Sequence, residues 1–102
     1  MSEEKQLQEF IELNEIKTVW NMLDDDHFSR SEFDLIILDH TKGEERLRVD
    51  YMALKDSCKF MAVGGLKDYP DVDKFWSEVK NNHEHVEIDG TRGIGILNIN
   101  CC

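Results

Sequence analysis

A near-continuous apolar run, F-D-L-I-I-L at residues 33–38, limits the folds open to this chain more than any other segment. Such a run is typical of a strand that is buried on both faces, and strands of that kind belong to parallel sheets. A second run, K-F-M-A-V at 59–63, is closed by Gly64-Gly65 and predicts another strand of the same kind. Because parallel strands need crossover connections, the segments that follow these runs decide the fold class.

Both segments that follow have helical periodicity. Apolar residues at i, i+4 and i+7 predict a helix over 43–56, and Thr41 with Glu44 has the spacing of a capping box. A second helix is predicted to begin at Pro70 and to end at Asn81-Asn82. Its apolar stripe, at i, i+3, i+4 and i+7, consists of Val72, Phe75, Trp76 and Val79.

The last part of the chain predicts two strands, at 85–88 and 94–99, joined by a Gly-containing turn. The order strand, helix, strand, helix favours right-handed crossovers and a parallel sheet. We therefore expect a small three-layer α/β fold, a Rossmann-like half-sheet. It has two parallel strands with crossover helices and a C-terminal strand pair that includes an antiparallel member. With 102 residues the chain is expected to form a single domain, 1–102, with its core at 33–100.

Residues 1–32 are predicted to form an acidic N-terminal helix and loop. Leu7, Phe10 and Ile11 lie on one helical stripe, but from Leu13 onward the apolar residues move to the opposite face. We favour a helix that continues to about Leu23. The alternative is a break near Asn14 with a short strand at 16–20, and a loop at 24–31 follows in either case.

The net charge of −10 is concentrated at the N-terminus, because residues 1–34 hold ten of the 22 acidic residues and three of the 12 basic ones. This balance argues against a protein whose main task is to grip nucleic-acid phosphates, so no direct nucleic-acid binding is expected. An acidic docking surface for a protein partner fits it, as does an acidic nucleic-acid mimic or inhibitor, including one of viral origin. A solvated helix face is the simpler interpretation.

The N-terminus has neither the basic nor the apolar region of a signal peptide, and no apolar run approaches the ~20 residues of a membrane helix. Three cysteines, Cys58, Cys101 and Cys102, do not suggest a disulfide framework. We expect no membrane association and a reducing cytoplasm, which is that of the host cell if the protein is viral. The sequence assigns no role to the adjacent pair of cysteines.

Candidate site residues follow the first predicted strand. In open α/β sheets, ligands bind beyond the carboxyl ends of the strands, where L-D-H-T-K at 38–42 and V-G-G-L-K-D at 63–68 lie. There Asp39 can bind a metal or a hydroxyl group, His40 can relay protons, and a desolvated Lys42 can act as a base. The alternative is that Asp39 and Thr41 merely cap the next helix.

The other titratable clusters do not make a metal site. His83 and His85 share a strand face but lack a third ligand at a known distance, so a solvated loop is favoured. Asp24-Asp25-Asp26 lacks the Gly and Glu of a calcium loop, and Asp71-Val72-Asp73 is better interpreted as the start of a helix. No metal-binding residues are predicted.

The stretches F-D-L-I-I-L-D-H-T-K, K-F-M-A-V-G-G, D-Y-P-D-V-D-K-F-W-S-E-V and G-I-G-I-L resemble the C-terminal half of class I SAM-dependent methyltransferases. The resemblance covers about residues 33–99. More specifically, the chain resembles the catechol O-methyltransferase-like and cephalosporin-hydroxylase-like enzymes, whose fourth strand ends in an Asp-His pair near the reacting centre. The catechol-type pattern L-D-H-x-K implies that Asp39 binds magnesium, that Lys42 is the general base and that His40 lies beside them.

The departures from that pattern concern the cofactor. No G-x-G-x-x-G occurs, and the lone G-x-G at 93–95 precedes a strand rather than a helix. Gly64-Gly65 stand where the catechol type has an Asp-Asn pair that completes its magnesium site. No cofactor is therefore expected, and SAM and Mg²⁺ bind only if the chain is an O-methyltransferase.

Two functional classes follow. The first is a reduced methyltransferase-like protein that acts as a non-catalytic interaction or regulatory protein. The second is a methyltransferase subunit or remnant that is active only with a partner supplying the SAM-binding half.

In the methyltransferase strand order the first strand pairs with the fourth, here 33–38, so an open edge and a homodimer through it are expected. Alternatively, residues 16–20 or a partner's strand cover this edge. In each case Leu7, Phe10 and Ile11 should be buried.

Overall fold

The computed structural model describes residues 3–23, 33–88, 90 and 92–99, which form a compact α/β protein. Five strands make one mixed sheet in the order β1-β2-β3-β5-β4, and three helices pack on it. The strands are β1 (Val19–Asn21), β2 (Phe33–Leu38), β3 (Cys58–Gly64), β4 (Glu84–Ile88) and β5 (Ile94–Asn98). The helices are α1 (Glu3–Leu13), α2 (Glu44–Leu54) and α3 (Pro70–Val79). The loop predicted at 24–31 lies outside the described residues.

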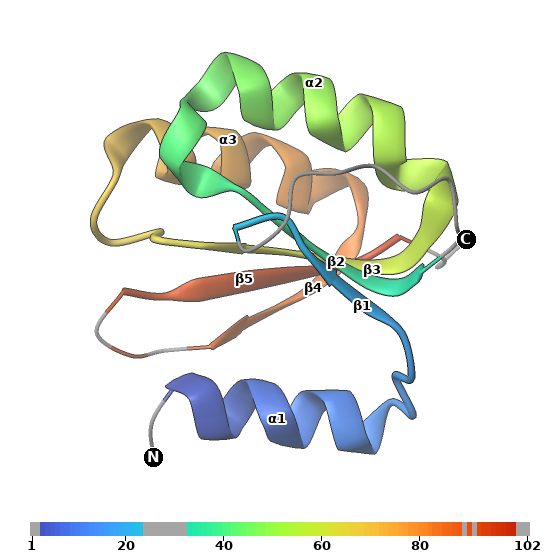
Figure 1. The fold of residues 1–102 in the computed structure, drawn as a ribbon. Helices are drawn as coiled ribbons and strands as arrows, with labels where there is room; N and C mark the ends of the chain where they lie inside the picture. The colour runs from blue at the N-terminus through green and yellow to red at the C-terminus, as the bar shows by residue number, and fades with distance from the viewer. Residues whose placement is uncertain (1–2, 24–32, 89, 91, 100–102) are drawn as a thin grey trace.

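The sheet is sandwiched between helices, with α2 and α3 on one face and α1 on the other (Figure 1). Strands β1, β2 and β3 are parallel, whereas β5 runs antiparallel to both β3 and β4. Since side chains alternate across a strand, β2 gives Ile36 and Leu38 to the core under α2 and α3, and Leu35 to the core under α1. The predicted layers and the antiparallel C-terminal pair are therefore present.

Burial on both faces explains the two apolar runs. Leu35 and Ile36 are fully buried on opposite sides of β2, and in β3 Met61, Ala62 and Val63 are each at most 2% exposed. The stripe of α3 predicted from Val72 to Val79 is buried as well, with Trp76 at its centre against β5. Hydrophobic burial of this kind is the main force that holds the layers together.

The favoured N-terminal helix to Leu23 is wrong, and the alternative break near Asn14 is confirmed. Helix α1 ends at Leu13, where the side-chain amide of Asn14 donates to the carbonyl of Phe10 at 2.9 Å and Glu15 has a φ of 55°. The chain then leaves the helix, and Trp20 becomes buried in β1. The apolar residues that fell on an opposite helical face therefore belong to a different element.

Strand β1 covers the sheet edge that was expected to be open. It pairs in parallel with β2 from Val19↔Leu35 to Asn21↔Ile37. The carboxylate of Asp34 accepts a hydrogen bond from the Lys17 backbone at 2.8 Å and extends this attachment beyond the strand. The expectation of an open edge at 33–38, on which the homodimer rested, is therefore wrong over 35–37. The alternative of a covering strand from this chain is confirmed, but that strand is at 19–21 rather than 16–20.

The predicted apolar stripe of helix α1 packs on the core that contains Leu35, on the face of the sheet opposite α2 and α3. Leu7, Phe10 and Ile11 contact the cluster that includes Leu35 and Ile96, but they are half-buried rather than fully buried. The N-terminus of α1 is attached through Glu3, whose carboxylate accepts hydrogen bonds from the backbone N–H groups of Arg92 and Gly93. In the described part of the chain, no helix is both long and apolar enough to cross a bilayer.

Candidate functional site

The carboxyl ends of β1, β2 and β3 open into a cavity of about 290 Å³ on the side of the sheet that α1 covers. Ala62 and Gly64 of β3 form part of its floor, His40 and Arg92 contribute polar groups, and α1 supplies Glu3, Glu4 and Leu7 to its wall. This is the edge of an open α/β sheet at which ligands are expected to bind. Of the three predicted site residues, only His40 lines the cavity.

Asp39 follows directly after β2, and its carboxylate caps the turn that comes next. Its Oδ1 accepts hydrogen bonds from the Thr41 N–H at 2.9 Å and from the Thr41 hydroxyl at 2.5 Å. The Lys42 Nζ lies 3.8 Å from the other carboxylate oxygen. Burial raises the pKa of Asp39, but the Thr41 hydrogen bonds and the Lys42 charge outweigh this effect and leave the pKa lowered. Asp39 is therefore an ionised cap of the short 3-10 turn His40–Lys42.

The capping box predicted for Thr41 and Glu44 is absent. The N-cap of α2 is Gly43, with a φ of 93° and no side-chain hydrogen bond, because the chain makes a separate 3-10 turn before the helix starts. Asp39 and Thr41 do form a cap, as the alternative interpretation proposed, but on that turn rather than on α2.

His40 is 7% exposed, and its ring lies against the glycine pair at the end of β3. Its Nδ1 is buried and has no hydrogen-bond partner among the described residues. The ring lies 5.2 Å from that of Tyr69. Burial lowers the pKa of His40, the charge of Asp39 opposes this shift, and the charge of Arg92 adds to it. His40 is therefore a neutral imidazole at pH 7.

Gly64-Gly65 make room for this ring. A Cβ on Gly65 would lie 2.8 Å from His40 Cδ2 and 2.9 Å from Tyr69 Cδ2, and Gly65 also has a φ of 77°. A Cβ on Gly64 would lie 3.7 Å from His40 Nδ1, an ordinary contact. The sequence does carry a signal for this role, because glycines at a strand end often mark a close approach of another group.

The described residues do not fit the magnesium site that the resemblance implies. Asp39 is used by Thr41 and Lys42, the glycine pair has no ligand atoms, and Asp68 lies 3.6 Å from the Arg92 guanidinium. No group of three or more His, Cys, Asp or Glu side chains that could hold a metal ion occurs at 3–23, 33–88, 90 or 92–99.

Two residues of the cavity were missed by the sequence analysis. There the Glu3 carboxylate accepts a hydrogen bond from the backbone N–H of Arg92 at 3.1 Å, although 89 positions separate the two residues. No local pattern indicates such a contact. The two imidazoles considered as a metal pair separate: His83 hydrogen-bonds the Tyr51 hydroxyl at 2.6 Å, whereas His85 is in β4 with its ring 5.7 Å from Trp76.

No family model, no curated protein and no solved structure matches this chain.

Replacing Asp39 with alanine is expected to lower the free energy of unfolding by about 1–2 kcal/mol, the usual scale of a lost cap. Lys42→Ala is the matched control and should change it by less than about 0.5 kcal/mol. Since the pKa of Asp39 is lower in the folded than in the unfolded state, its stabilisation is present above the unfolded pKa and is lost as the pH falls. The cost of Asp39→Ala should therefore shrink below about pH 4. Urea unfolding at several pH values measures this; equal costs at pH 7 and pH 3 would contradict it.

Proposed function

We propose that this chain is a reduced methyltransferase-like protein that acts by binding another protein rather than by catalysis. The observation that carries this proposal is the Asp39 turn. In the catechol-type pattern, Asp39 would hold a metal and Lys42 would accept a proton. Here the Asp39 carboxylate accepts two hydrogen bonds from Thr41, and Lys42 lies beside it as a counter-ion.

The topology supports the methyltransferase-like part of the proposal. Strand β1 lies beside β2, the place that the resemblance assigns to the first strand, and β3 follows β2 through a crossover that contains α2. The pair β5 and β4 completes the sheet with the antiparallel member that the Gly-containing turn predicts. With three residues, β1 forms only a short strand at that place.

One observation favours the second candidate, a methyltransferase subunit that is active only with a partner supplying the SAM-binding half. The cavity at the carboxyl ends of β1–β3 contains a buried imidazole whose Nδ1 has no partner among the described residues. An imidazole in such a cavity can bind a hydroxyl group of a substrate or move its proton.

Titration calorimetry with SAM distinguishes the two candidates. If the chain is an interaction protein, we expect no saturable SAM binding with a dissociation constant of about 10 μM or tighter, which corresponds to a binding free energy of about 7 kcal/mol. An active catechol-type methyltransferase serves as the positive control. Saturable binding of SAM to this chain at that affinity would rule out the non-catalytic proposal.

A further inference from the structure

We infer that the outer edge of β4 and the hollow beside it bind an extended cationic segment of a partner protein by strand addition. One apolar side chain of that segment would enter the hollow. This inference rests on the proposed function, since it names the partner chemistry of an interaction protein. It uses a surface separate from the cavity that contains His40.

The edge of β4 is the longer of the two edges of the sheet. Strand β4 has five residues and pairs only with β5 among the described residues, whereas β1 at the opposite edge has three. Glu84, His85, Val86 and Glu87 are all exposed. An exposed edge of this length presents unpaired backbone N–H and C=O groups, which an extended peptide can satisfy.

Within the part of the chain that the structure describes, a single helix covers this face of the sheet, and this explains the hollow. A helix is about 10 Å wide and strands are about 4.8 Å apart, so five strands need roughly two helices to cover one face. Helices α2 and α3 meet that need on one side, and α1 is the only helix of the described residues on the other (Figure 1). The described residues therefore leave the sheet partly uncovered between α1 and β4.

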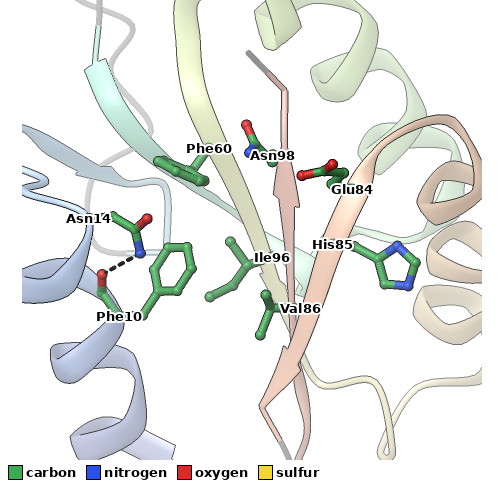
Figure 2. A pocket seen from close by; sticks show the side chains of 8 residues that line it. All are labelled: Phe10, Asn14, Phe60, Glu84, His85, Val86, Ile96 and Asn98. Atoms are coloured by element: carbon green, nitrogen blue, oxygen red, sulfur yellow. Dashed lines mark hydrogen bonds between the residues drawn. The ribbon is translucent and has the colours of Figure 1, made fainter. Parts of the chain in front are cut away.

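Figure 2 shows the resulting hollow, of about 160 Å³, between α1 and β4. Its floor is apolar, with Phe60 and the buried Ile96, and Phe10 and Val86 stand at its sides. The lining is completed with polar groups by Asn14, Glu84, His85 and Asn98. The rings of Phe10 and Phe60 are edge to face, with centroids 5.2 Å apart. An apolar cavity of about 150 Å³ can admit a group as large as benzene, so one aliphatic or aromatic side chain fits here.

The side chains of β4 set the chemistry of the partner. Glu84, His85 and Val86 of β4 all line the hollow, and the His85 ring is turned away from Val86 and Ile96 (Figure 2). Since cross-strand neighbours interact directly, an added strand would place an apolar residue opposite Val86 and cationic residues opposite Glu84 and Glu87. The Lys80 Nζ lies 3.7 Å from a Glu87 carboxylate oxygen, but the Glu87 side chain remains 50% exposed and accessible to a second cation.

Charge favours a cationic segment over a second copy of this chain. A second copy would bring a second net charge of −10 and the same edge carboxylates. Like charges oppose such assembly, whereas a cationic segment is attracted at long range and paired at the edge.

Amide NMR spectra of the full chain, titrated with synthetic peptides, test this inference. The probe is the peptide Val-Lys-Val-Thr-Lys with blocked ends. Added antiparallel to β4, its first residue lies opposite Ile88 and its last residue opposite Glu84. We expect saturable shifts concentrated at residues 84–88, with a dissociation constant of about 1 mM or tighter. The peptide Val-Glu-Val-Thr-Glu should bind at least about tenfold more weakly, and so should Val-Lys-Ser-Thr-Lys, which lacks the apolar residue opposite the hollow.

Charge reversal on the protein provides the matched variants. The double substitution Glu84→Lys with Glu87→Lys should lower the affinity for the lysine peptide by at least about tenfold and make the glutamate peptide the better ligand. Glu45→Lys with Asp56→Lys adds the same charge at exposed positions of α2 and the turn after it. Because salt screens distant charges, this control should keep the affinity for the lysine peptide within about twofold.

Three results would overturn the inference: no shifts with the lysine peptide, shifts that lie outside the β4 edge and its hollow, or equal binding of the lysine and glutamate peptides. Concentration-dependent shifts at 84–88 without peptide, with a doubled mass by light scattering, would instead assign the edge to a second copy. A separate sample titrated with SAM tests the proposed function, so failure of the peptide arm and failure of the non-catalytic proposal are read independently.

Discussion

Replacing Gly95 with valine is expected to destabilise the fold by about 3 kcal/mol, at the upper end of the range for overpacked cores. Gly95 lies in β5, and a Cβ there would lie 2.7 Å from the Cε2, Cζ2 and Cη2 atoms of Trp76. Trp76 is 1% exposed and packs between α3 and the sheet, so its ring cannot move aside without displacing the core. Urea unfolding measures the loss.

The partner of this contact provides the critical comparison. Trp76→Leu alone should cost about 3–4 kcal/mol, because it removes a large buried side chain and leaves a cavity. In the Gly95→Val background it should cost much less, since the valine then occupies part of the vacated space. Val49→Ala, at a position 62% exposed on α2, is the control and should stay within about 0.5 kcal/mol. Simple additivity of the two core changes would show that Gly95 and Trp76 are not coupled as the structure requires.

Gly65→Ala is expected to lower the free energy of unfolding by about 2 kcal/mol, because a non-glycine residue is strained at positive φ. At a φ of 77°, the added methyl group would also lie 2.8 Å from the His40 ring and 2.9 Å from Tyr69. Either the His40 ring moves into the cavity or β3 shifts at its end. Both responses disturb the candidate site as well as the fold.

The neighbouring glycine is the control for this prediction. Gly64 has no positive φ, and its Cβ would make only an ordinary contact of 3.7 Å with His40. Gly64→Ala should therefore change stability by less than about 1 kcal/mol. His40→Ala combined with Gly65→Ala should recover the part of the cost due to the ring and keep the part due to φ. Thermal and urea unfolding of the four proteins separates the two contributions, and equal costs for the two glycine substitutions would contradict this account.

Local patterns were sufficient for the elements whose burial is complete. The runs at 33–38 and 59–63 have apolar side chains on both sides of the backbone, and only a central strand buries both sides. The apolar stripe of α3 has the spacing of a helix and does not have the alternation of a strand. At the site, the spacing of Asp39 and Thr41 was enough to suggest a cap, because a capping hydrogen bond spans only two residues.

Patterns failed where the choice depended on a distant partner. The segment from Ile16 to Trp20 suits a helix or a strand by its apolar spacing. The edge of β2 decided for a strand at 19–21 by offering backbone hydrogen bonds. The capping box failed in a similar way, since the spacing of Thr41 and Glu44 does not show that a 3-10 turn comes between β2 and α2.

The sequence by itself therefore determined the α/β class, the two central strands, the presence of helices α2 and α3, and the antiparallel C-terminal pair. Each of these follows from side chains within one turn or one strand of one another, where period and burial are coupled. The predicted helix ends were two to three residues too late, because both helices end in short 3-10 turns. Only the tertiary structure decided that β1 covers β2, that Glu3 reaches the backbone of Arg92, and that Gly64-Gly65 receive the His40 ring. The physical reason is that these contacts join segments far apart in the chain, and their formation depends on the space and hydrogen-bonding groups that the rest of the fold leaves available.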